Sequence, residues 1–246
     1  MKRKLGINID GVIRNYLEKF EKVYIQTYIN NETLVDTTEE FELKVLTDEE
    51  EEARAQLIQK RIDEKITKPI DSFDLMNHYK FEDGLNYLQL EKTAEELFEE
   101  FIYEIKAFNI FGQADQYPWA VDSAHKLQQF GKDEDLFEVV LLSTLKGKAI
   151  SATYSFLGTG VACRIKNVHF IEEDFDKWEY CDAIIDVMPE TFQSKPEGCL
   201  SIKINTDFNQ WDEADLSYDS LRDAFQKLNE DGERELLQKL REFYSE

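Results

Sequence analysis

The sequence predicts an α/β fold: a doubly wound, Rossmann-like parallel sheet with a mainly helical cap inserted after the first strand and helix. Three observations predict it. The chain opens with an apolar strand, a glycine turn and a helix. The apolar run FEVVLL at 137–142 is typical of a central parallel strand. Further short apolar runs follow at 168–171, 183–185 and 200–204, each ending near a polar residue.

The first strand–helix unit is the clearest local pattern. A buried strand is expected at 4–9, and Gly11 follows it. Apolar residues then recur at helical spacing over 12–29, which predicts a helix. After the insertion, 117–130 predicts a helix with Pro118 near its start. Helices that would cover the sheet are also expected near 147–158, 217–228 and 232–244.

The segment 30–108 differs from the rest of the chain. Its first part predicts an exposed strand or hairpin and a charged helix, and a helix with an aromatic stripe is expected within 83–108. The α/β pattern returns after this segment. We therefore predict a core domain made of 1–29 and 109–246, and a cap domain made of 30–108.

The charge of the chain limits its partners. The 246 residues carry a net charge of -23 at pH 7. Nucleic acids and anionic membranes would be repelled, so neither is expected as a partner. Two interpretations stay open: a solvated acidic coat, or a surface that docks on a basic protein partner. No apolar stretch has the length of a signal peptide core or of a membrane span. The three cysteines, Cys163, Cys181 and Cys199, fit no zinc spacing. We therefore expect a cytoplasmic protein.

Polar residues at the ends of the predicted strands form the candidate site. Asn8 and Asp10 end the first strand. Ser143 ends the FEVVLL strand, Asp186 ends the AIID strand, and Lys177 lies between two later strands. Parallel strands place their carboxyl ends at one edge of the sheet, where ligands bind. We therefore expect these five side chains to converge.

In order and spacing, these residues resemble the four motifs of the haloacid-dehalogenase (HAD) superfamily of phosphatases. The likeness is greatest to the 5'-nucleotidase and deoxyribonucleotidase branch, which includes nucleotidase-like proteins of bacteriophages. It covers 4–26 and roughly 110–205, and the insertion lies where that family places a helical cap. The resemblance implies a phosphatase fold, a small phosphate ligand and Mg²⁺.

The resemblance also implies a role for each residue. Asp10 matches the general acid and base, which protonates the leaving oxygen and then activates water. Ser143 and Lys177 match the hydroxyl and the cation that hold the phosphoryl group. Asn8, Asp10 and Asp186 match the oxygen ligands of Mg²⁺.

Two positions depart from the family pattern. Asn8 stands where the nucleophilic Asp is expected, and a carboxamide cannot form an acyl-phosphate. Losing a covalent nucleophile is costly, on the order of 10⁶ in rate for a protease triad. Val187 stands where a second acid often follows Asp186, and Glu190 is the candidate to replace it. Mg²⁺ binding is therefore expected to be weak or lost.

Two functions of different classes follow. The first is a catalytically inactive phosphatase-like protein that acts as a binding or structural subunit. A bacteriophage origin would place it in the host cytoplasm, a virion or an assembly complex. The second is a Mg²⁺-dependent phosphomonoesterase acting on nucleoside or deoxynucleoside monophosphates, or on another small phosphate. The second requires a water activated by Asp10, because Asn8 cannot serve as the nucleophile. We favour the first for that reason.

Overall fold

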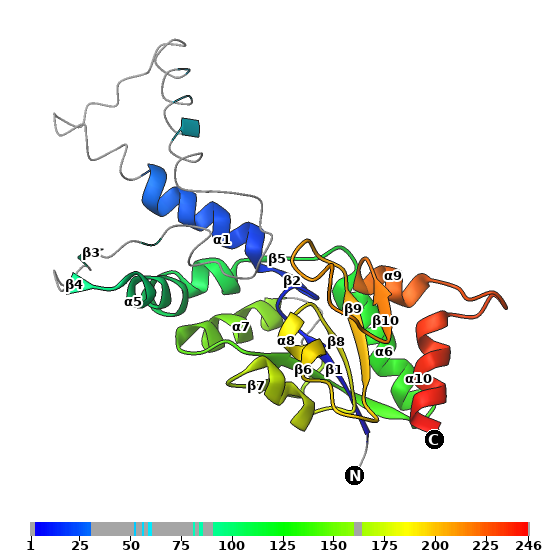
Figure 1. The fold of residues 1–246 in the computed structure, drawn as a ribbon. Helices are drawn as coiled ribbons and strands as arrows, with labels where there is room; N and C mark the ends of the chain where they lie inside the picture. The colour runs from blue at the N-terminus through cyan, green and yellow to red at the C-terminus, as the bar shows by residue number, and fades with distance from the viewer. Residues whose placement is uncertain are drawn as a thin grey trace.

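The computed structural model describes residues 3–30, 91–159 and 164–245, with isolated positions at 52, 56, 59–60, 81 and 84–85. Most of the segment predicted as a cap lies outside the described residues. The described part is an α/β layer structure from which the helix α1 (Tyr16–Tyr24) extends to one side (Figure 1). Within that part, no helix is long and apolar enough to cross a membrane.

A six-stranded parallel sheet forms the centre of the fold, which confirms the predicted doubly wound sheet. The strand order is β10-β9-β8-β1-β6-β7. β1 (Arg3–Asn8) pairs in parallel with β6 (Phe137–Ser143) on one side and β8 (Ala183–Asp186) on the other. Because the strand order reverses at β1, its carboxyl end marks the place where such sheets bind ligands. The outer strands are β7 (Val168–Phe170), β9 (Leu200–Ile204) and β10 (Leu216–Tyr218).

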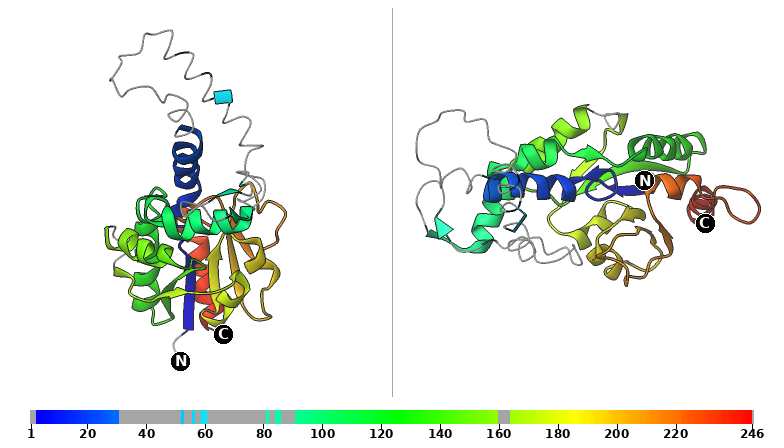
Figure 2. Two further views of the ribbon diagram at one scale, coloured as in Figure 1. Left: turned by 90° about the vertical axis from the view of Figure 1, so that its left-hand side faces the viewer. Right: turned by 90° about the horizontal axis from the view of Figure 1, so that it is seen from above.

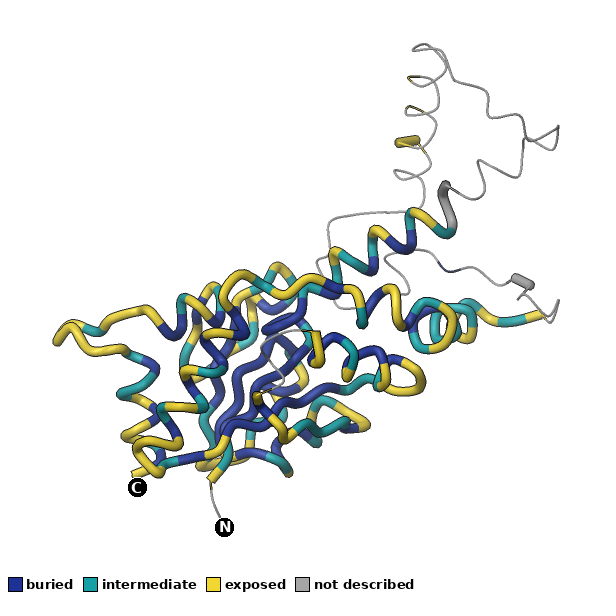
Figure 3. Tube along the Cα trace, turned by 180° about the vertical axis from the view of Figure 1, so that it is seen from behind, coloured by how far each residue is buried: buried dark blue, intermediate teal, exposed yellow. Residues whose placement is uncertain are grey.

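The two faces of the sheet bury different side chains. Leu5 and Ile7 point into the larger apolar cluster, whereas Val140 and Ile184 point to the opposite face with Trp178. This alternation follows from the two-residue period of a strand, and it leaves the central strands buried on both sides (Figure 3). The larger cluster is completed by α6 (Ala120–Asp133), α7 (Lys148–Thr159), α9 (Leu221–Gln226) and α10 (Glu235–Ser245).

A third apolar cluster lies beside the carboxyl end of the sheet. It joins α1 to two π-helical segments, Glu100–Ile105 and Phe108–Gly112, through stacked and edge-on aromatic rings. Phe101 and Ile102 are buried there, so this part of the stripe expected within 83–108 packs as core, whereas Ile105 is exposed and 86–90 lie outside the described residues. α1 rises from the sheet layer in the left view of Figure 2. The remaining elements are β2 (Arg14–Asn15), β3 (Gly84–Leu85), β4 (Glu91–Lys92), α5 (Ala94–Glu99), β5 (Asp115–Gln116), a 3₁₀ helix at Asp174–Glu179, α8 (Pro189–Gln193) and a π-helical turn at Ile25–Asn30.

Two predicted helices begin later than the sequence pattern indicated. The helix expected at 12–29 starts only after β2, which pairs with β5. The prediction of a helix at 217–228 was wrong at its start, because Leu216–Tyr218 forms the strand β10, which pairs with β9. Backbone partners from distant segments override local helical spacing at both places. Ser220 then begins α9, since its side chain accepts a hydrogen bond from the backbone N–H of Asp223.

Candidate active site

A tight turn after β1 brings the first two candidate residues to the edge of the sheet. Gly11 has φ 87°, a left-handed conformation that favours glycine. A Cβ atom at this position would lie 2.6 Å from Cγ2 of Val187, so the turn presses directly against the end of β8. This close approach places Asn8 and Asp10 beside Asp186.

Asn8 links β1 to β8 through its amide. The side chain is buried, and Nδ2 donates to Oδ1 of Asp186 at 2.7 Å and to the backbone carbonyl of Asp10 at 2.9 Å. The opposite amide orientation would place an oxygen against two acceptors, so the surroundings fix the nitrogen on this side. Both N–H groups of the amide are therefore used inside the protein.

Asp186 is a fully buried carboxylate with donors on both oxygens. Burying a charge is costly unless hydrogen bonds and an opposite charge compensate it. Five donors do so here: Asn8 Nδ2 (2.7 Å) and the backbone N–H groups of Val187 (2.6 Å) and Met188 (3.1 Å) on Oδ1, and Lys177 Nζ (2.7 Å) and Thr191 Oγ1 (2.8 Å) on Oδ2.

Lys177 is also fully buried, and its ammonium group pairs with both Asp174 and Asp186. Burial lowers the pKa of Lys177, but attraction from Asp186 and Asp174 outweighs it and the net pKa is raised. Burial raises the pKa of Asp174, Lys177 opposes this, and the neighbouring Asp186 adds to it. The positive charge expected to meet a phosphate is thus shared between two carboxylates.

Asp10 is held by side chains from two directions. Nε and Nη2 of Arg14 donate to Oδ1 at 2.9 and 2.6 Å, and Oγ of Ser143 donates to Oδ2 at 2.7 Å. Arg14 is completely buried, with its guanidinium 5.0 Å from the ring centre of Phe111 and 5.1 Å from that of Phe156. The residue matched to the acid and base is therefore fixed by an internal ion pair.

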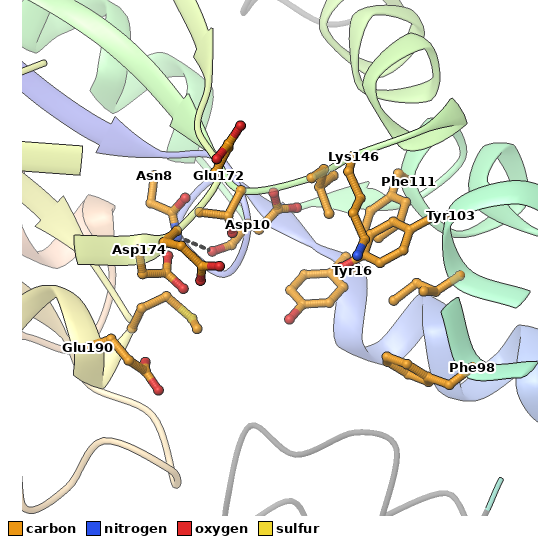
Figure 4. Close-up of a pocket in the computed structure, with 15 residues that line it drawn as sticks. Asn8, Asp10, Tyr16, Phe98, Tyr103, Phe111, Lys146, Glu172, Asp174 and Glu190 are labelled. Carbon is orange, nitrogen blue, oxygen red and sulfur yellow. Dashed lines mark hydrogen bonds between the residues drawn. The ribbon is translucent and has the colours of Figure 1, made fainter. Parts of the chain in front are cut away.

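A cavity of about 430 Å³ opens beside these residues (Figure 4). Its wall is acidic on the side of the sheet and aromatic on the opposite side, where Tyr16, Tyr103 and Phe111 lie. Burial, with the charge of Asp10 adding to it, raises the pKa of Tyr103 to about 12. Among the described lining residues, Lys146 is the only basic one and the five acidic ones are Asp10, Glu172, Glu173, Asp174 and Glu190.

The structure brings all five predicted site residues together, and it adds three that the sequence did not indicate: Arg14, Asp174 and Thr191. The spacing of Asp174 three residues before Lys177 was an available signal, because it suits an ion pair on one helical turn. Glu190, the candidate second acid, lines the cavity, and Val187 supplies a backbone N–H to Asp186 instead of a carboxylate.

The residues as arranged do not fit a divalent cation. Mg²⁺ needs oxygen ligands with free lone pairs. Asn8 turns its nitrogen toward Asp186, the Asp186 oxygens accept five hydrogen bonds, and the Asp10 carboxylate accepts three. Across the described ranges, no group of three or more His, Cys, Asp or Glu side chains is placed to hold a metal ion.

The parallel sheet, its strand order and its strand-end site define the HAD-like, Rossmann-type α/β class. Among solved structures, YfnB of Bacillus subtilis, assigned to the HAD hydrolases and bound to magnesium, superposes with a TM-score of 0.50 and 13% identity over 92% of this chain and 97% of that one. CbbY of Rhodobacter sphaeroides in complex with phosphate gives 0.46 and 11% over 90% and 95%. A haloacid dehalogenase-like hydrolase of Xanthomonas campestris gives 0.45 and 7% over 99% and 96%.

No protein-family model matches the sequence, and no curated protein matches it. At 13% identity, the likeness to YfnB shows the fold alone. The superposition on YfnB therefore supports a HAD-like fold for this chain and nothing finer. Activity must be argued from the site itself.

Proposed function

We propose that this protein is a non-hydrolytic HAD-fold protein that binds a basic protein partner at its acidic strand-end cavity. The hydrogen bond from Nδ2 of Asn8 to Oδ1 of Asp186 carries the proposal. It commits the side chain at the nucleophile position to a structural contact. An amide that donates to a carboxylate has no anionic oxygen with which to attack phosphorus.

The state of Asp10 supports the same conclusion. A general acid and base must exchange its proton with substrate or water. The Asp10 carboxylate instead accepts three hydrogen bonds, two from Arg14 and one from Ser143. Catalysis would require Asp10 to leave a buried guanidinium without its partner, which is strongly unfavourable.

The charge of the cavity favours a basic ligand over a phosphate. Five carboxylates and one amine line it in the described part of the chain, on a protein of net charge -23. Asp10 and Asp174 are paired with buried cations, so the excess negative charge comes from the three glutamates. Fields of one sign repel like-charged ligands and raise the association rate of opposite ones. The aromatic wall adds to this, because Lys and Arg side chains bind favourably over aromatic faces. The bacteriophage resemblance would place such a subunit in the host cytoplasm or in a virion.

The second candidate is a Mg²⁺-dependent phosphomonoesterase acting on a nucleotide or another small phosphate. The HAD-like fold favours it, as does the contact of Ser143 with Asp10 at the expected edge of the sheet. It requires Asn8, Asp10 and Lys177 to exchange their internal partners for water and substrate.

Phosphate release from a panel of nucleoside and deoxynucleoside monophosphates, with and without Mg²⁺, tests the absence of hydrolysis. Wild type, Asp10→Asn, Asn8→Asp and Asn8→Asp/Asp10→Asn are compared. We expect no release by wild type above the protein-free blank. Turnover by wild type that disappears in Asp10→Asn would establish the phosphomonoesterase instead.

Binding is tested with a labelled oligolysine peptide and an oligoglutamate peptide of equal length, by fluorescence anisotropy. The triple variant Glu172→Gln/Glu173→Gln/Glu190→Gln removes three cavity charges. We expect it to weaken oligolysine binding at least about tenfold. The control is a variant with the same change in net charge at residues outside the cavity lining: Glu197→Gln/Glu230→Gln/Glu233→Gln. Its affinity for oligolysine should fall far less. Equal losses in the two triples would contradict a cavity-based binding site.

A further inference from the structure

Two acceptors from separate segments face one nitrogen atom at the end of β1. The backbone carbonyl of Asp10 follows β1, and the carboxylate of Asp186 ends β8. Nδ2 of Asn8 lies 2.9 Å from the first and 2.7 Å from the second. Two acceptors that face each other away from bulk water are costly unless a donor or a cation lies between them. Oδ1 of Asp186 also accepts from the backbone N–H groups of Val187 and Met188, but these do not reach the Asp10 carbonyl. The amide supplies one N–H to each.

We infer that the Asn8 amide takes the bridging place of a divalent cation, so that the strand-end site is complete without a metal ion. Asn8, Asp10 and Asp186 are the residues that the family resemblance assigned to Mg²⁺, and the amide nitrogen connects the same three. The inference concerns the ion content of the site and goes beyond the proposed partner binding.

The charges around the site agree with this assignment. Asp174, Asp186 and Asp10 contribute three negative charges, and Lys177 and Arg14 contribute two positive ones. Within this ion-paired set one negative charge remains, and the Asn8 amide and the backbone N–H groups after Asp186 stabilise it. Glu172, Glu173 and Glu190 line the cavity outside the set. A divalent cation would have to displace hydrogen-bond donors that already satisfy these oxygens, so its binding would bring little gain in free energy.

An aspartate at position 8 would reverse this balance. It would remove the bridging donor and raise the net charge of the cluster from one negative to two, with a carboxylate facing Asp186. Like charges at such a distance repel strongly when buried. A divalent cation between them then becomes the favourable way to satisfy the oxygens. Metal dependence and the nucleophile should therefore be gained or lost together at this one residue.

Thermal unfolding in EDTA and in 10 mM MgCl₂ tests the inference. We expect Asn8→Asp to unfold about 5 °C or more below wild type in EDTA, and to recover at least about half of that loss with Mg²⁺. Asn8→Ala is the matched control, because it removes the donor without adding charge, and its loss should not depend on Mg²⁺. Nonspecific binding to the acidic surface affects all variants, so the Mg²⁺-induced shift is compared with that of Asn8→Ala. An Asn8→Asp shift no larger than the Asn8→Ala shift would overturn the inference.

A titration of wild type with Mn²⁺, followed by electron paramagnetic resonance, decides the matter even if Asn8→Asp does not fold. We expect no ion at this site. Any Mn²⁺ bound to surface carboxylates should remain in Asp186→Asn, whereas an ion bound by wild type and lost in Asp186→Asn would overturn the inference. Hydrolysis by wild type in EDTA would overturn the proposed function while leaving this inference intact, so the two can fail separately.

Discussion

Arg14 and Asp10 form an ion pair in which the cation is completely buried and the carboxylate reaches the cavity. Nη2 of Arg14 lies 2.6 Å from Oδ1 of Asp10, and the side chains are 0% and 13% exposed. Arg14 also donates to the carbonyl of Phe111 and to Thr153, so it ties the turn after β1 to two helical segments. The pair therefore stabilises the fold and fixes the edge of the site at once.

Replacing Arg14 should be among the most damaging single changes at the site. Arg14→Met leaves the Asp10 carboxylate without its buried partner, and breaking such a pair costs about 3–5 kcal/mol. Urea unfolding measures the loss. Lys148→Ala is the control, because Lys148 is highly exposed and pairs with Glu104 at 3.2 Å, a contact that contributes at most about 1 kcal/mol. The double variant Arg14→Met/Asp10→Asn should regain part of the loss; a loss below about 1 kcal/mol in Arg14→Met would show that the pair is dispensable.

Gly11 should tolerate no side chain. Gly11→Ala combines a left-handed backbone with a Cβ atom 2.6 Å from Val187, and we expect a cost of about 3 kcal/mol. Gly158 is the matched control, since it lies in α7 with no atom within 4 Å of an added Cβ. Gly158→Ala should stabilise the protein by about 0.5–1 kcal/mol, because alanine favours the helix. Similar unfolding midpoints for the two variants would contradict this account of the turn.

Asp174 should make stability depend on pH in the direction opposite to an ordinary surface acid. Burial raises its pKa above the ordinary value of 3.8, so the folded protein holds the proton more tightly than the unfolded chain. The free energy of unfolding contributed by this group therefore falls as pH rises from about 3.8 to the folded pKa, and the loss is complete above it.

Asp174→Asn removes this titration. At pH 7 the variant should be as stable as wild type or more stable, and its advantage should shrink as the pH is lowered toward 4. Urea unfolding between pH 4 and 8 tests this, with Asp176→Asn on the same short helix as the control. A clear loss of stability in Asp174→Asn at pH 7 would show that pairing with Lys177 outweighs the cost of burial.

One physical reason explains why the sequence could predict both the sheet and the convergence of the site residues. Apolar runs reveal buried parallel strands, and parallel strands place their carboxyl ends at one edge. Asn8, Ser143 and Asp186 could thus be brought together without a structure. The division into a core and a cap stays a prediction, because most of 30–108 lies outside the described residues.

The partners of these residues could not be predicted in the same way. Arg14 lies in a segment that reads as the start of a helix, and its burial depends on Phe111 and Phe156, which are about a hundred residues away or more. Lys177 was expected to face a phosphate, and only the folded chain shows its ammonium shared between Asp174 and Asp186. β10 likewise depends on hydrogen bonds from β9 that no local pattern reveals.

The two hydrogen bonds of the Asn8 amide also bear on the stability cost of placing an aspartate at position 8. Asparagine and aspartate codons differ by one base, so Asn8→Asp is a single-base change. The surroundings favour the amide, since its two N–H groups donate to Asp186 and to the Asp10 carbonyl. An Asn8→Asp variant is therefore expected to lose stability where Mg²⁺ is absent, before any gain in catalysis. The neighbours of Asn8 thus favour asparagine at this position on grounds of stability alone.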